Sequence, residues 1–209
     1  MFTGIVEAMC PVVGLRRGAT WRIILDLGGL AEDTKLGDSI AVNGVCLTVA
    51  ALSGTQASFD AIGETIGRTA LARLAEGERV NVERSLRMGD RISGHFVAGH
   101  VDGVGTIRAK DERPEQAVVR VAVAPELTAL MAVKGSVAVD GVSLTLVDVS
   151  RDSFAVALIP YTLAETTLGI KGAGDPVNVE IDLLARYVAR LLGRGAGLSE
   201  GFLHEHGFC

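Results

Sequence analysis

The sequence has few of the residues that characterise several large protein classes. Aromatic residues make up 4% of its 209 residues, and the formal net charge is −5 with no cluster of Lys and Arg. This composition is opposite to that of a nucleic-acid-binding protein, which uses basic patches and stacking aromatics. The 3 cysteines, Cys10, Cys46 and Cys209, are far apart and form no C-x-x-C pair. A disulfide framework and a structural zinc site are therefore not expected.

The beginning of the chain also lacks the features of a targeting segment. Residues 1–7 have neither the positive charge nor the long apolar run of a signal peptide. No apolar stretch approaches the roughly 18 residues that a membrane-spanning helix requires. The sequence therefore predicts a soluble cytoplasmic protein with reduced cysteines and without a membrane or nucleic-acid partner.

A sequence of eleven residues occurs twice, 97 positions apart. Residues 39–49 read SIAVNGVCLTV and residues 136–146 read SVAVDGVSLTL, with seven identical positions. The segment VNVE of residues 80–83 returns at residues 177–180, and TGIV of residues 3–6 returns as AGHV at residues 98–101. A repeat of this length indicates a duplicated domain. We expect two domains, residues 1–96 and 97–182, followed by a C-terminal segment, residues 183–209.

The two copies differ at positions where the difference changes the chemistry. Two similar pockets with different side chains suggest two bound ligands in different roles. The pairs that differ are Ile5 and His100, Asn43 and Asp140, and Cys46 and Ser143.

Short β-strands separated by turn residues account for most of both copies. Asn43-Gly44 and Asp140-Gly141 predict tight turns, because these residue types tolerate positive φ. Five or six strands in about 90 residues, with turns this frequent, favour a small barrel. The predicted fold is mainly β: two tandem six-stranded Greek-key barrels and a C-terminal helix. The expected strands are residues 2–15, 21–27, 39–51, 57–62 and 79–84, with counterparts at 97–109, 117–124, 136–150, 153–159 and 176–182.

Short helices are expected between the strands, and one longer helix has no counterpart in the other copy. The short segments are residues 30–36, 64–74, 125–133 and 161–168. In residues 183–192, apolar side chains recur with helical spacing. This stripe is a candidate oligomer contact, and packing against its own barrel is the alternative. The Gly-rich tail from residue 193, with His204 and His206, is expected to be loose.

Small polar residues within apolar strands are candidates for chemistry. Ser143 and Thr145 lie on one face of a strand, as do Cys46 and Thr48, because alternate side chains share a face. That face is either the interior or the outer wall of a barrel. Cys46 is either a nucleophile or a small buried hydrophobe, and the sequence shows no cationic neighbour to activate a thiolate.

Two histidines and two aspartates are further candidates with a structural alternative for each. His95 and His100 lie five residues apart beside glycines, and imidazole suits proton transfer near neutral pH. A pair of satisfied histidines is the structural alternative, and a metal site with Asp102 is a third. Asp140 either shapes a turn or faces a ligand. Asp182 either caps a helix or faces a ligand.

The motifs, taken in order, resemble the riboflavin synthase α-subunit family. They begin with MFTGIV at residue 1, VNGVCLTV at residue 42 and GHFVAGHV at residue 94, and they continue with DGVSLT at residue 140, IPYTLAETTL at residue 159 and VNVEID at residue 177. The resemblance covers residues 1 to 190. It implies two barrels of one topology and a helix that assembles three chains into a homotrimer, with lumazine synthase as a further partner.

The resemblance also implies an activity that needs no cofactor or metal. Two molecules of 6,7-dimethyl-8-ribityllumazine exchange a four-carbon unit, giving riboflavin and 5-amino-6-ribitylamino-2,4(1H,3H)-pyrimidinedione. Each barrel would bind one lumazine, and the N-terminal barrel of one subunit would face the C-terminal barrel of another. The rival class is the lumazine proteins, which share the fold but bind the ligand without chemistry.

By analogy with the family, individual residues receive expected roles. His100, Ser143 and Thr145 would contact the reacting ring in the C-terminal barrel, and Ser39 and Cys46 would act from the N-terminal side. Substrate-binding positions would be Phe2, Thr3, Gly4, Val6, Thr48, Glu64, Thr65, His95, Gly99, Lys134, Asp140, Gly141, Ile159, Pro160, Thr162 and Asp182. The chain departs from the family pattern at Tyr161, where the usual residue is Glu, so a side-chain contact from that position is in doubt.

Overall fold

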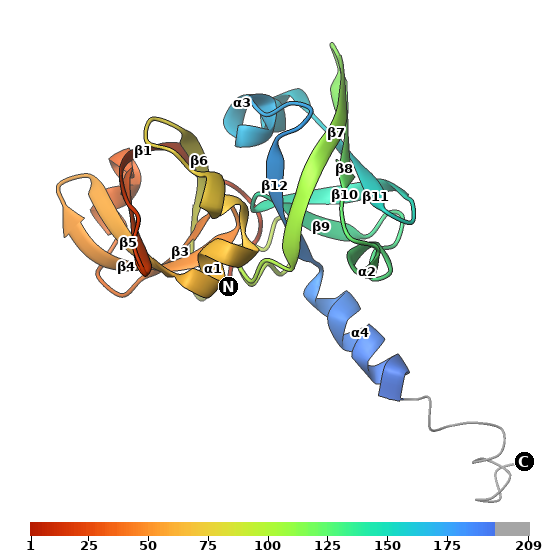
Figure 1. The fold of residues 1–209 in the computed structure, drawn as a ribbon, viewed down its shortest axis with the longest axis horizontal. Helices are drawn as coiled ribbons and strands as arrows, with labels where there is room; N and C mark the ends of the chain where they lie inside the picture. The colour runs from red at the N-terminus through yellow and green to blue at the C-terminus, as the bar shows by residue number, and fades with distance from the viewer. Residues whose placement is uncertain (195–209) are drawn as a thin grey trace, which may run out of the picture.

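The computed structural model of the chain describes residues 1–194 (Figure 1). Two strand-rich bodies lie side by side, and one helix extends away from them. The predictions for the tail, including His204 and His206, concern residues outside this described range.

The first copy forms a closed antiparallel barrel. Its strand order is β1-β2-β5-β4-β3-β6, and β6 pairs with β1 to close it. The inward side chains are apolar, as the alternation in β4 shows: Val45, Leu47 and Val49 are buried, whereas Thr48 is exposed. The strands are β1 (Ala8–Arg16), β2 (Thr20–Asp26), β3 (Ser39–Val42), β4 (Val45–Ser53), β5 (Gln56–Ile62) and β6 (Arg79–Arg84).

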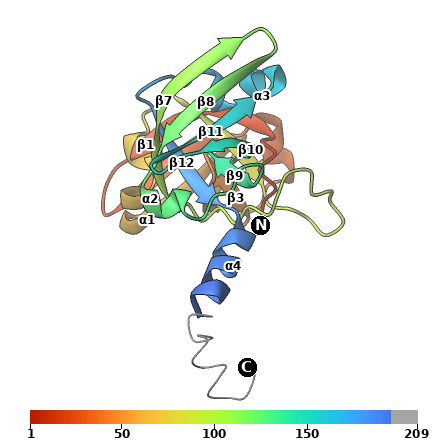
Figure 2. The ribbon, with the colours of Figure 1, turned by 90° about the vertical axis from the view of Figure 1, so that its right-hand side faces the viewer.

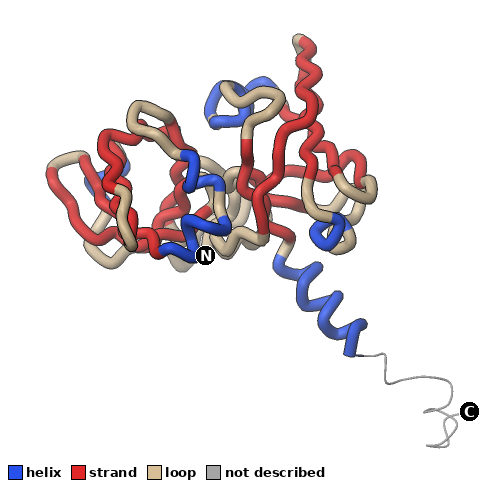
Figure 3. The backbone as a smooth tube through the Cα atoms, in the orientation of Figure 1, coloured by secondary structure: helices blue, strands red, loops and turns tan. Residues whose placement is uncertain are grey.

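The second copy forms a barrel of the same topology. Around the ring its strands follow the order β7-β8-β11-β10-β9-β12, which matches the first copy strand for strand. The predicted pair of six-stranded barrels is therefore confirmed (Figure 3). The strands are β7 (Gly103–Arg113), β8 (Gln116–Ala122), β9 (Ser136–Val139), β10 (Val142–Val149), β11 (Ser153–Leu158) and β12 (Pro176–Ile181).

The duplication extends to the irregularities of the sheets. The register shifts between Val12 and Gly14 in β1, and between Ile107 and Ala109 at the same place in β7. The predicted tight turns are also present in both copies: Asn43 has φ 44° and Asp140 has φ 46°. Bulges bend and twist strands, so their repetition helps to close both barrels with the same shape.

The first strand of each copy starts later than the sequence predicts. Strand β1 starts at Ala8 rather than residue 2, and β7 starts at Gly103 rather than residue 97. The residues before each strand leave the barrel instead, and Phe2 pairs with Val97 in an antiparallel bridge between the copies. Alternating apolar residues are found both in this bridge and in barrel strands. Sequence periodicity therefore does not distinguish the bridge from a barrel strand.

Short helices lie between the strands, and two of the predicted ones are interrupted. Residues 64–74 form α1 (Gly63–Arg68) and the 3-10 helix η2 (Ala70–Arg73), separated by Thr69 in an extended conformation. Thr166 likewise separates α3 (Pro160–Glu165) from η3 (Thr167–Gly169). Each threonine donates its hydroxyl to the carbonyl four residues earlier, at 2.7 Å. The remaining helices of this kind are η1 (Gly28–Asp33) and α2 (Pro125–Thr128).

The C-terminal helix α4 (Leu183–Arg194) projects away from both barrels (Figures 1 and 2). Its start is fixed by Asp182, whose Oδ1 accepts a hydrogen bond from the backbone N–H of Leu184 at 2.9 Å. The predicted apolar stripe is on this helix and does not pack on its own barrel. Five of its side chains are exposed by at least half: Leu184, Tyr187, Val188, Leu191 and Leu192.

Candidate functional site

The small polar residues of β4 and β10 face the outside of the barrels. Cys46 and Ser143 are half-buried, and Thr48 and Thr145 are exposed, while their strand neighbours fill the barrel interiors. These small polar side chains therefore lie on the outer walls of the barrels and not in the barrel interiors. Ser39 lies opposite Thr48 in the register of β3 and β4, which places it on this same wall.

Two buried glutamates fix the segments that cross between the copies. Glu83 accepts hydrogen bonds from the backbone N–H groups of Thr3, at 2.7 Å, and Gly4, at 3.0 Å. Glu180 does the same for Ala98, at 2.7 Å, and Gly99, at 2.9 Å. Burial raises the pKa of both carboxyls, and these hydrogen bonds oppose the rise. This glutamate is not among the predicted site residues, although its recurrence in the two VNVE segments is visible in the sequence.

Each crossing segment lies against the candidate strand of the other copy. The backbone N–H of Ser143 donates to the carbonyl of Gly4 at 2.8 Å, and that of Cys46 donates to Gly99 at 2.9 Å. Both glycines have positive φ, and a Cβ on either would lie 2.6 Å from the Cβ of Ser143 or Cys46. Only glycine allows this approach. Val6 and Val101 then pack against the core of the C-terminal and N-terminal barrel, respectively.

A cavity of about 280 Å³ lies where the second crossing segment meets the N-terminal barrel. His100 and Cys46 both line it, together with Glu64 and Thr65 of α1. The predicted grouping of His100 with Ser143 is therefore wrong within the chain, because residues 98–101 cross to the other copy. The complete lining is Val45, Cys46, Glu64, Thr65, Arg68, Thr69, Gly99, His100 and Val101.

The histidine that contacts Ser143 is His95. Its Nδ1 lies 2.7 Å from the Ser143 Oγ, and the tautomer determines which of the two atoms donates. Burial lowers the pKa of His95, and the negative charge of Asp182 opposes this shift. The His95 Nε2 is buried and has no hydrogen-bond partner among residues 1–194. A neutral imidazole beside a hydroxyl is suited to accept or relay a proton near neutral pH.

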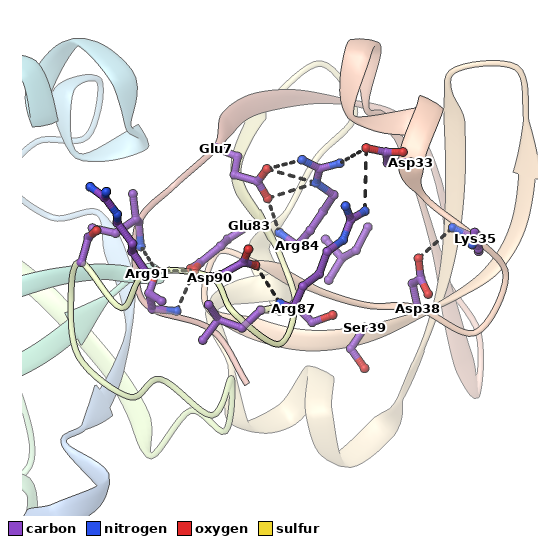
Figure 4. Close-up of a pocket in the computed structure, with 16 residues that line it drawn as sticks. Glu7, Asp33, Lys35, Asp38, Ser39, Glu83, Arg84, Arg87, Asp90 and Arg91 are labelled. Atoms are coloured by element: carbon purple, nitrogen blue, oxygen red, sulfur yellow. Dashed lines mark hydrogen bonds and ion pairs between the residues drawn. The ribbon is translucent and has the colours of Figure 1, made fainter.

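A larger cavity of about 580 Å³ opens between the N-terminal barrel and the linker of residues 85–93 (Figure 4). Ser39 and Thr3 reach its wall, but more than half of its lining residues are charged, and some of these form ion pairs with one another. Arg84 holds Glu7 through hydrogen bonds of 2.6 to 3.2 Å, and Arg87 lies 3.7 Å from Asp33.

The remaining predicted residues fall into exposed and buried groups. Glu64, Lys134, Ile159 and Pro160 are exposed, and Thr162 is half-buried. Phe2 is 0% exposed and packs between the copies with Ala41, Val97 and Ala138, and the backbone of Gly141 lies against Gly44.

Asp140 has no exposed surface. Its Oδ2 pairs with Lys171 Nζ at 2.5 Å, and its Oδ1 accepts the backbone N–H of Asn178 at 2.8 Å. Asp140 therefore lies beneath the contact between the two copies and lines neither cavity.

Within residues 1–194, no group of three or more His, Cys, Asp or Glu side chains is arranged to hold a metal ion. Over the same part of the chain, every helix is too short or too polar to cross a membrane.

Known proteins share this double-barrel fold. A family model described as the lumazine binding domain matches residues 3–85 and again residues 98–182. A solved structure of LumP complexed with riboflavin superimposes with a TM-score of 0.82 at 26% identity, covering 87% of this chain and 99% of that one. LumP has also been solved with 6,7-dimethyl-8-(1'-D-ribityl) lumazine, with a TM-score of 0.79. The fold and site therefore define a double-barrel protein of the lumazine-binding class.

Full-length relatives define the family more closely. Riboflavin synthase of Mycobacterium tuberculosis (strain ATCC 25618 / H37Rv) is 44% identical over 203 residues, 94% of this chain and 100% of that one. Riboflavin synthase of Bacillus amyloliquefaciens is 38% identical over 215 residues and covers 100% of both chains. The chain belongs to the riboflavin synthase family.

Proposed function

We propose that the protein catalyses the riboflavin synthase reaction, in which two molecules of 6,7-dimethyl-8-ribityllumazine give riboflavin and 5-amino-6-ribitylamino-2,4(1H,3H)-pyrimidinedione. One observation supports this proposal: equivalent positions on the outer walls of the two barrels carry different reactive groups. The N-terminal site has Cys46 and His100, and the C-terminal site has Ser143 and His95. A reaction between two identical substrates needs such a difference, because one substrate donates the four-carbon unit and the other accepts it.

The chemistry requires alignment and a proton acceptor. The C7 methyl group of the lumazine is acidic because its anion delocalises into the ring, so a positioned base contributes about 10²–10⁴-fold. Correct orientation of the two rings supplies more, since effective molarities reach about 10⁵–10⁸ M. The imidazoles of His95 and His100 are the groups suited to proton transfer, and Ser39, Ser143, Thr48 and Thr145 add hydroxyls on the same walls. The reaction draws on no cofactor.

A homotrimer is part of the proposal. The exposed apolar side chains of α4 extend over a helix that does not pack on either barrel of its own chain. Burying such a stripe against copies of itself would stabilise an assembly. In that assembly the N-terminal site of one chain would face the C-terminal site of the next, so that two bound lumazines meet. The chain is proposed to act in the cytoplasm.

Incubation of the protein with 6,7-dimethyl-8-ribityllumazine alone tests the activity. We expect steady growth of flavin absorbance, with one riboflavin formed for every two lumazines consumed. Ser143→Ala and His100→Ala should slow turnover far more than they weaken lumazine binding, whereas Ser150→Ala, at an exposed position after β10, should leave turnover unchanged. Lumazine binding with altered fluorescence but no riboflavin would contradict the proposal and indicate a binding protein.

A further inference from the structure

Helix α3 of the C-terminal copy matches helix α1 of the N-terminal copy in its backbone. The residue before α1, Ile62, has φ −74° and ψ 161°, and the residue before α3, Ile159, has φ −80° and ψ 159°. Each helix also ends at an extended threonine, with ψ of 162° or 161°. Tyr161 is the second residue of α3, as Glu64 is of α1. Because Glu64 lines the N-terminal cavity, Tyr161 occupies the equivalent position beside the C-terminal barrel.

The other residues that line the N-terminal cavity also have counterparts in the C-terminal copy, at the repeat offsets. Five of the nine lining residues are of the same type in both copies, so the two sites share one framework. The matching residues of the C-terminal copy are Gly4, Val6, Val142, Thr162 and Thr166. The four positions that differ are Cys46 and Ser143, Glu64 and Tyr161, Arg68 and Glu165, and His100 and Ile5.

The ring of Tyr161 is free to contact a ligand in the C-terminal site. It is 72% exposed, which makes it the most exposed aromatic side chain among residues 1–194, and Ile5 is 46% exposed. At these two positions the C-terminal site presents apolar surface, whereas the N-terminal site has a carboxylate and an imidazole. The polar side chains assigned to the C-terminal site come from other segments: His95 follows the linker, Lys134 lies in the turn before β9, and Ser143 is in β10.

We propose that the ring of Tyr161 contacts the flat conjugated ring of the lumazine or flavin that occupies the C-terminal site. This proposal rests on the proposed function, because it takes the cavity and its counterpart to be sites for such a ligand. Aromatic rings attract one another in offset stacks or edge to face. None of the nine residues that line the N-terminal cavity is Phe, Tyr or Trp, so the ligand there has no such contact from them. The two ligands of one chain therefore have different ring environments, as their unequal roles require.

The test follows the fluorescence lifetime of riboflavin bound to the whole protein. Contact with a phenol quenches an excited flavin, because the phenol transfers an electron to the excited ring and then recovers it. The benzene ring of phenylalanine does not quench in this way. We expect bound riboflavin to show a short lifetime in the C-terminal site and a longer one in the N-terminal site.

Exchange of residues between the copies assigns the two lifetimes. Tyr161→Phe should remove the short lifetime and change riboflavin affinity by less than about twofold, since it keeps an aromatic ring. Tyr161→Glu, which copies the N-terminal residue, should remove the short lifetime and weaken binding at the C-terminal site by about threefold to tenfold. Glu64→Tyr should shorten the lifetime at the N-terminal site. Tyr187→Phe changes the other tyrosine of the chain, which is exposed on α4, and should alter neither lifetime.

Two results would overturn the proposal: one lifetime for both sites of the wild-type chain, or a short lifetime that survives in Tyr161→Phe. Riboflavin binding verifies that each variant is folded. Formation of riboflavin from 6,7-dimethyl-8-ribityllumazine is measured separately. A chain that makes riboflavin but keeps the short lifetime in Tyr161→Phe disproves only the role of Tyr161. A chain that loses the short lifetime in Tyr161→Phe but makes no riboflavin disproves only the proposed activity.

Discussion

Arg186 of α4 donates a hydrogen bond from Nη2 to the backbone carbonyl of His100 at 3.0 Å. The same nitrogen lies 2.7 Å from Asp102 Oδ2, which also accepts the backbone N–H of Ile181 at 2.8 Å. The C-terminal helix is thereby attached to the segment that carries His100 into the N-terminal cavity. Arg186 touches no reacting group in this arrangement, so its role in the proposed reaction is to position His100.

Arg186→Gln is expected to lower kcat by about tenfold with a smaller change in KM, because a displaced His100 affects the aligned state most. Arg186→Lys should restore part of the loss through one retained hydrogen bond. Arg190→Gln, at an exposed position of the same helix, is the control. Steady-state kinetics and size-exclusion chromatography are measured together. A loss of activity that only follows dissociation of the oligomer would contradict the positioning role.

His95 should make the stability of the protein depend on pH in a defined direction. Because burial lowers its pKa, the folded chain binds the proton less readily than the unfolded chain, whose histidine titrates near the usual value of about 6.5. Stability therefore rises with pH where the unfolded state binds more protons. The stabilisation by neutral His95 is complete above a pH of about 6.5. It is lost as pH falls from there through the lower pKa of His95 in the folded state.

The measurement is urea unfolding of the wild-type protein and His95→Gln between pH 5 and pH 8. The wild-type protein should lose free energy of unfolding below pH 6.5 relative to the variant, and the difference should be constant above pH 7. His100→Gln provides the comparison at an exposed imidazole. Parallel pH profiles for the wild-type protein and His95→Gln would show that His95 is not responsible.

The internal repeat is why so much of the fold could be predicted from the sequence. The repeated turn residues at Asn43 and Asp140 marked the same hairpin in both copies, and the structure has both turns. The apolar spacing of residues 183–192 likewise identified α4 as a helix. These signals are local, because turn chemistry and periodicity act within a few residues.

The crossing of the two copies could not be predicted, because it depends on contacts about 80 residues apart. Glu83 binds Thr3 and Gly4, and Glu180 binds Ala98 and Gly99. The recurrence of the glutamate in the two VNVE segments was visible, but its partners were not. This crossing is also why His100 was expected beside Ser143, whereas it lies in the cavity with Cys46.

Leu184→Glu combined with Leu191→Glu should dissociate the proposed trimer. The two side chains are 63% and 68% exposed in the single chain, so charging them costs little in the monomer but opposes burial in an assembly. Riboflavin formation should fall at least tenfold, because the proposed site spans two subunits. Analytical ultracentrifugation measures the mass, and Arg190→Glu on the same helix is the control. A fully active monomer would disprove both the trimer and the shared site.

The pair Asp140–Lys171 allows the two copies to be compared by exchange of residues. At the corresponding positions of the N-terminal copy the chain has Asn43 and Leu74, both buried. The Oδ1 of Asn43 accepts the backbone N–H of Asn81 at 2.7 Å, as Asp140 Oδ1 does for Asn178. Burial raises the pKa of Asp140, and the charge of Lys171 opposes that rise. The ion pair therefore replaces a neutral pair that the same framework already accommodates.

Lys171→Leu alone should destabilise the protein by about 3–5 kcal/mol, because it leaves a buried carboxylate without its partner. Asp140→Asn alone should cost less, about 1–3 kcal/mol, since Lys171 Nζ keeps the carbonyl of Pro176 at 2.8 Å. The double variant reproduces the N-terminal pair and should lie within about 1 kcal/mol of the wild-type protein. Denaturant unfolding of all four proteins gives the coupling energy. Additive losses in the double variant would show that Asp140 and Lys171 act independently. The neutral pair Asn43 and Leu74 would then not be equivalent to the ion pair.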